Sequence, residues 1–256
     1  MTALVELKNV TTRFGGQVVH DHISLTLEER QIMGLAGGSG SGKSVLLRTI
    51  LGLRPPQAGT VLIDGHDLYA LPPEKRLPLQ RRWGVLFQNG ALFSGLTVLD
   101  NVALPLREHA RLPDHSADNL ALFKLQMVGL DEQAAIKHPS ELSGGMVTRA
   151  AIARALALDP AVLFLDEPTG ALDPVAAAAL DELMATLRRV LALTVFIITH
   201  DIATLVGICD RIAIIADHKV HVGTLDELRA NSDPAVRSYF HSPRLDDLIA
   251  CRQRRR

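Results

Sequence analysis

One stretch of the sequence constrains this chain more than any other, because it fits the phosphate-loop pattern G-x-x-x-x-G-K-S/T. It reads Gly37, Gly38, Ser39, Gly40, Ser41, Gly42, Lys43 and Ser44. An apolar, strand-like run over residues 31–36 precedes it, and a helix-like run over residues 45–50 follows. The pattern requires a strand–loop–helix context, so these flanks favour a phosphate loop over the alternative, a flexible Gly/Ser turn.

Such a loop binds anions at the start of a helix. Glycines let successive backbone N–H groups turn toward the anion, and the helix dipole adds partial positive charge. Lys43 would reach the β- and γ-phosphates of a nucleotide, and Ser44 would be a ligand of Mg²⁺. The sequence therefore predicts a site for a nucleotide and its magnesium ion.

Composition and charge limit the classes of protein to consider. A chain of 256 residues can hold one α/β domain with a smaller lobe. Its formal net charge of −1 argues against a dedicated nucleic-acid binder, which would carry a basic excess. Its two cysteines, Cys209 and Cys251, lack metal-ligand spacing and suit a reducing compartment. We expect neither a secretory signal nor a membrane span, because no apolar run approaches ~20 residues.

The rest of the pattern predicts an α/β fold around a parallel sheet. Residues 4–27 favour short antiparallel strands with a turn at residues 14–16, and residues 89–159 have mostly helical periodicity. Beyond them, apolar strands alternate with helices, as in a doubly wound sheet. Predicted strands lie at residues 60–63, 83–87, 161–165, 193–199 and 211–216, predicted helices at residues 175–190 and 202–208, and short helices with a basic tail at residues 225–256.

Two carboxylates follow the predicted strand that ends at Leu165. Asp166 and Glu167 would lie beside the phosphate loop if both strands belong to one parallel sheet. Asp166 would then orient Mg²⁺ through a coordinated water, and Glu167 would polarise the attacking water as a general base. The alternative is a solvated strand end, since acidic residues commonly stop strands.

Ser143, Gly144 and Gly145 precede a helix of small residues predicted at residues 147–158. As a lone pattern they are a routine helix cap. One nucleotide, however, does not need two glycine-rich helix starts in the same molecule. Two chains arranged head to tail would use both, so we expect a homodimer in which each chain lends this turn to the γ-phosphate that its partner holds.

In this order, the motifs resemble those of the ATPase subunit of ATP-binding cassette (ABC) transporters, and the resemblance covers residues 5–228. It implies a single α/β domain with the P-loop NTPase fold. That domain would combine an ABC ATPase core, an antiparallel N-terminal subdomain, a helical subdomain at residues 89–159 that carries the signature motif, and a C-terminal extension at residues 225–256. It also implies ATP hydrolysis coupled to transport, with ATP and Mg²⁺ bound.

The resemblance implies a role for each matching position. Phe14 would stack on adenine, Gln88 would touch Mg²⁺ and link to the membrane subunit, and His200 would contact the γ-phosphate. Taken alone, these residues could be a core aromatic, an ordinary strand-end polar residue and a hydrogen-bonded structural histidine. The implied catalytic residues are Lys43, Glu167 and His200; the implied nucleotide ligands are Phe14, residues 37–44, Val45, Gln88, Asp166 and, in trans, Ser143, Gly144 and Gly145; the implied Mg²⁺ ligands are Ser44, Gln88 and, through water, Asp166.

A narrower resemblance is to the ATPases of Mla (maintenance of lipid asymmetry) phospholipid transporters, also described as the toluene-tolerance or organic-solvent-resistance type. It is carried by residues 87–94, 100–108, 143–146, 216–219 and 231–234 with Arg237. It implies a peripheral protein on the cytoplasmic face of the inner membrane of a Gram-negative bacterium. Its partners would be a permease, a periplasmic lipid-binding subunit and a small regulatory subunit.

Two departures and several alternatives accompany these resemblances. Met146 stands where the signature usually has glutamine, and residues 166–173 follow the general ABC sequence rather than a special variant. The alternatives are an ABC transporter of another substrate, a soluble ABC ATPase acting on DNA or ribosomes, and a scaffold that binds ATP without turnover. Glu167 and His200 argue against the scaffold, and the missing coiled-coil insertion and zinc cysteines argue against the soluble class. The basic tail at residues 252–256 is either a solvated end or a contact to anionic lipid.

Overall fold

The computed structural model describes residues 3–88, 90–240 and 249 of the chain. These residues form two compact units, of which the first joins the described residues up to 80 to those from 194 onward, and the second contains the described residues between 81 and 193. Asn89, Cys251, the basic tail and most of the extension beyond residue 240, all discussed above, lie outside the described residues.

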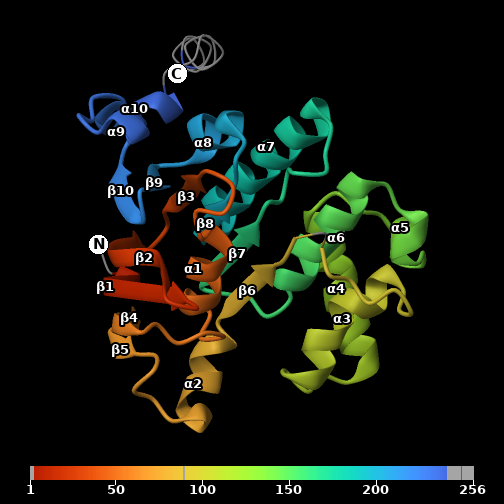
Figure 1. Ribbon diagram of the computed structural model, residues 1–256. Coiled ribbons are helices and arrows are strands. Elements are labelled where there is room, and N and C mark those ends of the chain that lie inside the picture. The colour runs from red at the N-terminus through yellow and green to blue at the C-terminus, as the bar shows by residue number, and fades with distance from the viewer. Residues whose placement is uncertain (1–2, 89, 241–248, 250–256) are drawn as a thin grey trace. The chain divides into compact units, whose positions relative to one another are not determined.

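The first unit contains an antiparallel sheet with the strand order β2-β1-β4-β5 (Figure 1). Its strands are β1 (Ala3–Phe14), β2 (Gln17–Glu28), β4 (Ala58–Ile63) and β5 (His66–Asp67). The predicted turn joins β1 to β2, and both of its glycines have positive φ. In the second half of β2, Ile23, Leu25 and Leu27 are buried while the residues between them are less buried, so one face of the strand faces the core. The antiparallel prediction is confirmed.

The first unit also contains the strands β10-β9-β3-β8. β3 (Ile32–Gly37) pairs in parallel with β8 (Thr194–Ile198) and with β9 (Arg211–Ala216), whereas β10 (Lys219–Gly223) is antiparallel to β9. β3 is buried along its whole length, as expected for a central strand of a parallel sheet. α8 (Ile202–Ile208) packs on it so closely that a Cβ at Gly34 would collide with Leu205.

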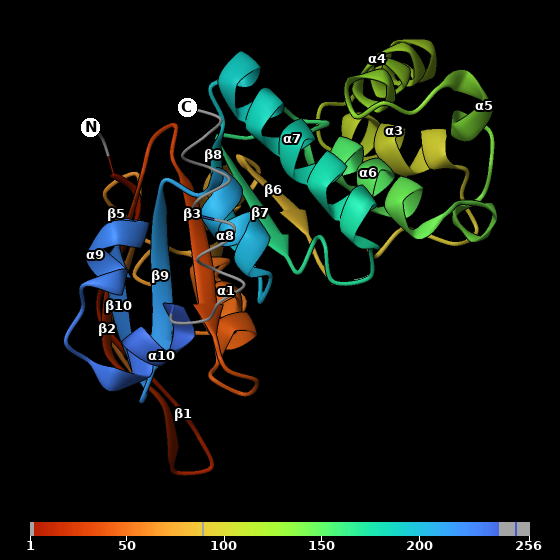
Figure 2. The same cartoon turned by 90° about the horizontal axis from the view of Figure 1, so that it is seen from above.

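Four further helices lie among the described residues of the first unit. α1 (Lys43–Ile50) follows β3, and α2 (Pro73–Gln80) follows β5. α9 (Leu225–Arg229) and α10 (Pro234–Phe240) lie near β9 and β10 in both views (Figures 1 and 2). Val236 and Phe240 of α10 are fully buried, so this part of the predicted C-terminal extension packs into the core of the unit.

The second unit combines two parallel strands with a group of helices. β6 (Trp83–Leu86) pairs with β7 (Val162–Asp166), and the ring of Trp83 meets Phe164 edge to face, with 5.9 Å between the ring centroids. The helical stretch that the sequence predicted is present. Its elements are α3 (Val98–Glu108), α4 (Asp114–Met127), α5 (Glu132–Ala135), the 3₁₀ turn η1 (Pro139–Glu141) and α6 (Gly144–Ala155), and α7 (Pro174–Leu191) follows β7.

The structure corrects the sequence analysis in one place that bears on the site. The helix predicted at residues 147–158 begins at Gly144 and ends at Ala155. Ser143 is therefore the N-cap itself, and the two glycines of the motif form the first turn. Among the described residues, no helix combines the length and apolarity needed to cross a bilayer.

Candidate functional site

The predicted phosphate loop connects the central strand β3 to α1. Gly37 and Gly42 have φ angles of +153° and +96°, a region that side-chain-bearing residues rarely adopt. A Cβ at Gly37 would be 2.7 Å from Ser41 Oγ, and one at Gly42 would be 2.5 Å from Val19 Cγ1, so space as well as backbone conformation requires glycine at both. The loop is thus closely fitted against the strands around it.

The N-terminus of α1 is left open for an anion. Its N-cap is Gly42, which has no side chain to accept from the first N–H groups, and its first turn carries no acidic residue. The positive end of the helix dipole is therefore not offset locally. Ser41 Oγ is buried and has no hydrogen-bond partner among the described residues, which is a further polar group available to a ligand.

Lys43 folds back over the loop that precedes it. Its Nζ donates to the carbonyl oxygens of Gly37, at 2.8 Å, and Gly38, at 3.0 Å. These bonds place an ammonium group against the start of the loop, and Lys43 also lines the cavity beside it. A triphosphate entering here would find a cation already in position.

Phe14 reaches the phosphate loop from the tip of the β1–β2 hairpin. It lines a cavity of about 360 Å³ together with Val19, Gly40, Gly42, Lys43, Ser44 and Val45. Phe14 is 44% exposed, so the alternative of a core aromatic does not apply. The cavity thus has a phosphate-binding loop on one side and an exposed aromatic ring on another.

His20 of β2 lies under the same loop. It is fully buried, and its Nδ1 is 2.7 Å from Thr12 Oγ1. Its Nε2 would be 2.6 Å from a Cβ at Gly42. Burial lowers the pKa of His20 from 6.5 to about 4, with the Gly42 backbone opposing the shift and His218 adding to it. A neutral imidazole therefore supports the loop from below.

His200 follows β8 at the same edge of the sheet. Leu35 of β3 is paired with Ile198 of β8, and Thr199 N donates to Leu35 O at 3.1 Å. Extending this register by two residues places His200 level with Gly37. His200 is exposed, and the structure thus brings three predicted groups to one end of the first unit: the loop, Phe14 and His200.

The second unit carries the predicted acidic pair and glutamine at the carboxyl ends of β7 and β6. Leu86 is paired with Leu165, so the same register places Gln88 level with Glu167. Asp166 is buried, whereas Gln88 is exposed. Glu167 has a φ of +52°, an uncommon conformation for a residue other than glycine that is often found at functional sites.

The turn that carries the signature motif, Ser143, Gly144 and Gly145, lies close to residues 171–172 in this unit and is called the signature turn below. Ser143 Oγ accepts from Met146 N at 3.4 Å and so caps α6. A Cβ at Gly144 would lie 3.8 Å from Ala171 O, and one at Gly145 would lie 3.9 Å from Leu172 Cδ2. Ser143 and Gly144 are exposed, as a surface that meets a second chain requires.

Sequence reasoning missed two residues that hold the segment after Gln88. Arg154 of α6 donates to the carbonyl oxygens of Gly90 and Ala91 at 3.0 and 2.8 Å, and burial lowers the pKa of its guanidinium. Asn101 of α3 is fully buried; its Oδ1 accepts from Phe93 N at 2.7 Å and its Nδ2 donates to Phe93 O at 3.0 Å. Their partners are backbone groups, which leave no trace in the residue pattern.

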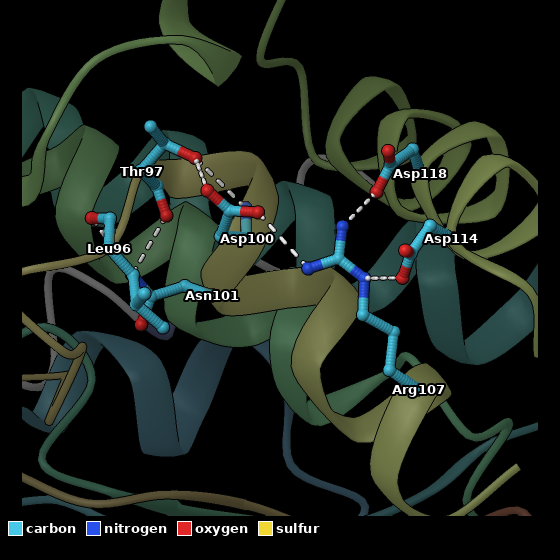
Figure 3. A network of polar contacts seen from close by, with 7 residues as sticks. All are labelled: Leu96, Thr97, Asp100, Asn101, Arg107, Asp114 and Asp118. Carbon is cyan, nitrogen blue, oxygen red and sulfur yellow. Dashed lines mark hydrogen bonds and ion pairs between the residues drawn. The ribbon is translucent and has the colours of Figure 1, made fainter. Parts of the chain in front are cut away.

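A second polar network joins α3 to α4 (Figure 3). Arg107 contacts three carboxylates: Asp100 at 3.1 Å, Asp114 at 3.2 Å and Asp118 at 2.5 Å. The hydroxyl of Thr97, together with Arg107, holds the pKa of the Asp100 carboxyl below its ordinary value. One guanidinium thus bridges two helices of this unit.

Comparison with known proteins identifies the family. Residues 20–170 match the ABC transporter family. The chain belongs to this family. The ATP-binding protein MlaF of the intermembrane phospholipid transport system of Haemophilus influenzae is 41% identical, over 91% of this chain and 88% of the relative. The Mycobacterium leprae protein named "Probable ribonucleotide transport ATP-binding protein mkl" is 36% identical, over 96% of this chain and 71% of the relative.

The fold comparison agrees. The dimeric ATP-binding cassette MJ0796, solved in a post-hydrolysis state with ADP and Pi, has 34% identity and a TM-score of 0.78, and the match covers 86% of this chain and 98% of that one. Both resemblances inferred from sequence and the α/β fold of an ABC cassette are therefore confirmed. As an ABC ATPase, the chain binds and hydrolyses ATP.

Proposed function

We propose that this ATPase powers a transporter that moves phospholipids between the inner and outer membranes of a Gram-negative bacterium. The observation that carries the proposal is the 41% identity to MlaF, which extends over 91% of the chain. In this role the protein would be peripheral, on the cytoplasmic face of the inner membrane. It would work with a permease, a periplasmic lipid-binding subunit and a small regulatory subunit, and it would not bind nucleic acid.

The cavity of the first unit would hold the nucleotide. Lys43 and the backbone N–H groups of residues 37–45 would bind the phosphates, because the open end of α1 and the ammonium group supply positive charge there. Phe14 would stack on adenine. His200 would contact the γ-phosphate from the end of β8, at the level of the phosphate loop.

The acidic pair of the second unit would support hydrolysis. Glu167 would take a proton from the attacking water, and its unusual backbone conformation favours such a function. Ser44, Gln88 and the water-linked Asp166 offer oxygen donors, which fit Mg²⁺. When bound, Mg²⁺ would neutralise charge on the phosphates. Asp166 is buried at a strand end, which would hold its carboxylate in one orientation.

The signature turn would act on the nucleotide of a partner chain. Ser143, Gly144 and Gly145 stand at the positive end of α6, and two of them are exposed. Two chains in head-to-tail arrangement would then be joined by ATP, and hydrolysis would release them. The dimeric state of the related cassette with ADP and Pi supports this arrangement. The exposed surface near Gln88 would pass the motion to the permease.

Substitution of the proposed general base tests the hydrolytic site. Glu167→Gln should keep the affinity for ATP, slow hydrolysis at least ~100-fold, and trap dimers on gel filtration with ATP and Mg²⁺. Glu182→Gln removes the same charge from an exposed position on α7 and is the matched control, with wild-type turnover expected. If Glu167→Gln hydrolyses ATP at the rate of this control, Glu167 is not the general base.

The substrate is tested with the assembled transporter. The chain should co-purify with a permease when both are expressed together, and reconstitution into phospholipid vesicles should couple ATP hydrolysis to lipid movement. The similarity to mkl makes a second candidate, transport of another substrate such as a ribonucleotide. Lipid movement that does not depend on ATP, together with ATPase stimulation by a ribonucleotide, would favour that candidate.

A further inference from the structure

Phe14 is already stacked on one side in this structure. The guanidinium carbon of Arg54 lies 3.4 Å from the centroid of the Phe14 ring. That separation is the contact distance of a cation–π pair, and the cation covers one face of the ring. Phe14 is still 44% exposed and lines the cavity at the phosphate loop. One face is thus occupied by the protein, and part of the residue remains exposed to the cavity.

Arg54 is itself fixed from two directions. Its guanidinium donates to Arg13 O at 3.2 Å, and its own carbonyl accepts from the Tyr69 hydroxyl at 2.5 Å. The same hydroxyl lies 2.8 Å from Thr49 O, in the last turn of α1. Burial raises the pKa of Tyr69 to about 12, so it keeps its proton at every physiological pH. Arg54 Nε is buried and has no hydrogen-bond partner among the described residues.

The loop around Arg54 also binds the strand that ends at Phe14. Gln57 Oε1 accepts from Arg13 N at 2.7 Å, and Gln57 N donates to Thr11 O at 2.9 Å. With the bond from Arg54, three hydrogen bonds tie the end of β1 to the connection between α1 and β4. The segment between α1 and β4 follows the C-terminal end of α1, whose N-terminal end begins at the phosphate loop. These hydrogen bonds therefore hold the hairpin tip against the C-terminal end of the phosphate-binding helix.

We propose that Arg54 is the positioning residue of the nucleobase platform. It holds the Phe14 ring in one orientation, so that the ring presents its uncovered face to the base of the bound nucleotide. The inference rests on the proposed role of Phe14 and adds a residue that acts through it. Preorganisation of this kind improves affinity because the ring does not lose rotamer freedom when the base arrives. A lysine at position 54 would keep the charge but would lack the planar group that stacks on the ring.

The test separates binding of the base from binding of the phosphates. Calorimetric titration with MgATP and with magnesium tripolyphosphate is made on the wild type, Arg54→Ala, Arg54→Lys, Phe14→Ala and the double variant. Arg54→Ala should bind MgATP about 5-fold more weakly, because the released ring must then be ordered when the base binds, and should bind tripolyphosphate like the wild type. The affinity of Arg54→Lys for MgATP should lie between those of the wild type and Arg54→Ala. Arg48→Ala removes an exposed arginine from α1 and should change neither affinity.

Each outcome has one meaning. If Arg54→Ala weakens MgATP but not tripolyphosphate, and the double variant is no weaker for MgATP than Phe14→Ala alone, Arg54 acts through the ring, and the inference is supported. If Arg54→Ala weakens MgATP and tripolyphosphate equally, the residue only stabilises α1 and the phosphate loop, and the inference is wrong. If Phe14→Ala lowers the affinity for MgATP but Arg54→Ala does not, the inference fails while the proposed role of Phe14 stands. If neither change affects MgATP, the platform itself is rejected.

Discussion

The buried His20 makes the stability of the first unit depend on pH in a calculable way. Its pKa is about 4 in the folded chain, whereas an unfolded chain has the ordinary value of 6.5. Because the folded state keeps the imidazole neutral, the two states bind protons equally above pH 6.5. Between pH 6.5 and about pH 4, the unfolded chain binds a proton at this histidine and the folded chain does not. Stability is therefore lost as the pH falls through this window.

The size of the loss follows from the same linkage. Each pH unit between the two pKa values lowers the free energy of unfolding by at most about 1.4 kcal/mol. Between pH 6.5 and pH 5 the burial of His20 should therefore remove about 2 kcal/mol from the free energy of unfolding. This loss adds to whatever the other titrating groups contribute, so it is measured as a difference between variants.

Urea unfolding at pH 7.5 and pH 5.0 measures this difference. Wild type should lose about 2 kcal/mol more than His20→Gln over this interval, because glutamine can still meet Thr12 but does not titrate. His66→Gln changes an exposed histidine of the same unit and should follow the wild type. The comparison uses the change with pH, so a lower starting stability of His20→Gln does not affect it. Equal losses in wild type and His20→Gln would refute the reasoning.

Two further predictions concern the second unit. Asn101→Ala should lower the free energy of unfolding, measured by urea titration, by about 2–4 kcal/mol, because it leaves the Phe93 backbone groups without their partner. Asn119→Ala, at an exposed position of α4, is the control and should have little effect. Arg107→Ala should lower the thermal midpoint more in low salt than in 1 M salt, because the three carboxylates left near one another repel and salt screens this repulsion. Arg189→Ala, on α7, is the control and should show no such salt dependence. A salt-independent shift for Arg107→Ala would assign its effect to packing instead.

The parts of the fold that follow from local pattern could be predicted from sequence. A buried strand, a glycine loop and a helix are adjacent in the chain, so their order alone indicates the phosphate loop. β10 was missed because the turn that precedes it consists of Asp217 and His218. Both have positive φ, but this pair is not a typical sequence signal for a hairpin turn, as Asn-Gly is. α2 was missed because its prolines argue against a helix, although Pro73 stands at its first residue.

The parts of the site that depend on distant contacts could not be predicted from the residues alone. The position of Phe14 above the loop came from family resemblance, since nothing in the local pattern brings a hairpin tip to a helix start. Arg54 and His20 had no signal at all. Arg54 finds its hydrogen-bond acceptor 41 residues earlier in the chain. His20 contacts a loop whose glycines already match the phosphate-loop pattern, so nothing in the sequence indicated a buried neighbour there. Side chains that act on other side chains are visible only once the chain is folded.

The signature turn shows why its unusual residue is compatible with activity. Ser143 accepts a long hydrogen bond, 3.4 Å, from the backbone N–H of Met146. A serine oxygen that accepts one bond still has its own O–H to donate, so binding a phosphate of the partner would not require the cap to break. The cap uses the backbone at position 146 and not the side chain. Methionine in place of the usual glutamine therefore leaves the helix start intact, and any effect of Met146→Gln on ATP hydrolysis must arise from side-chain contacts outside the cap.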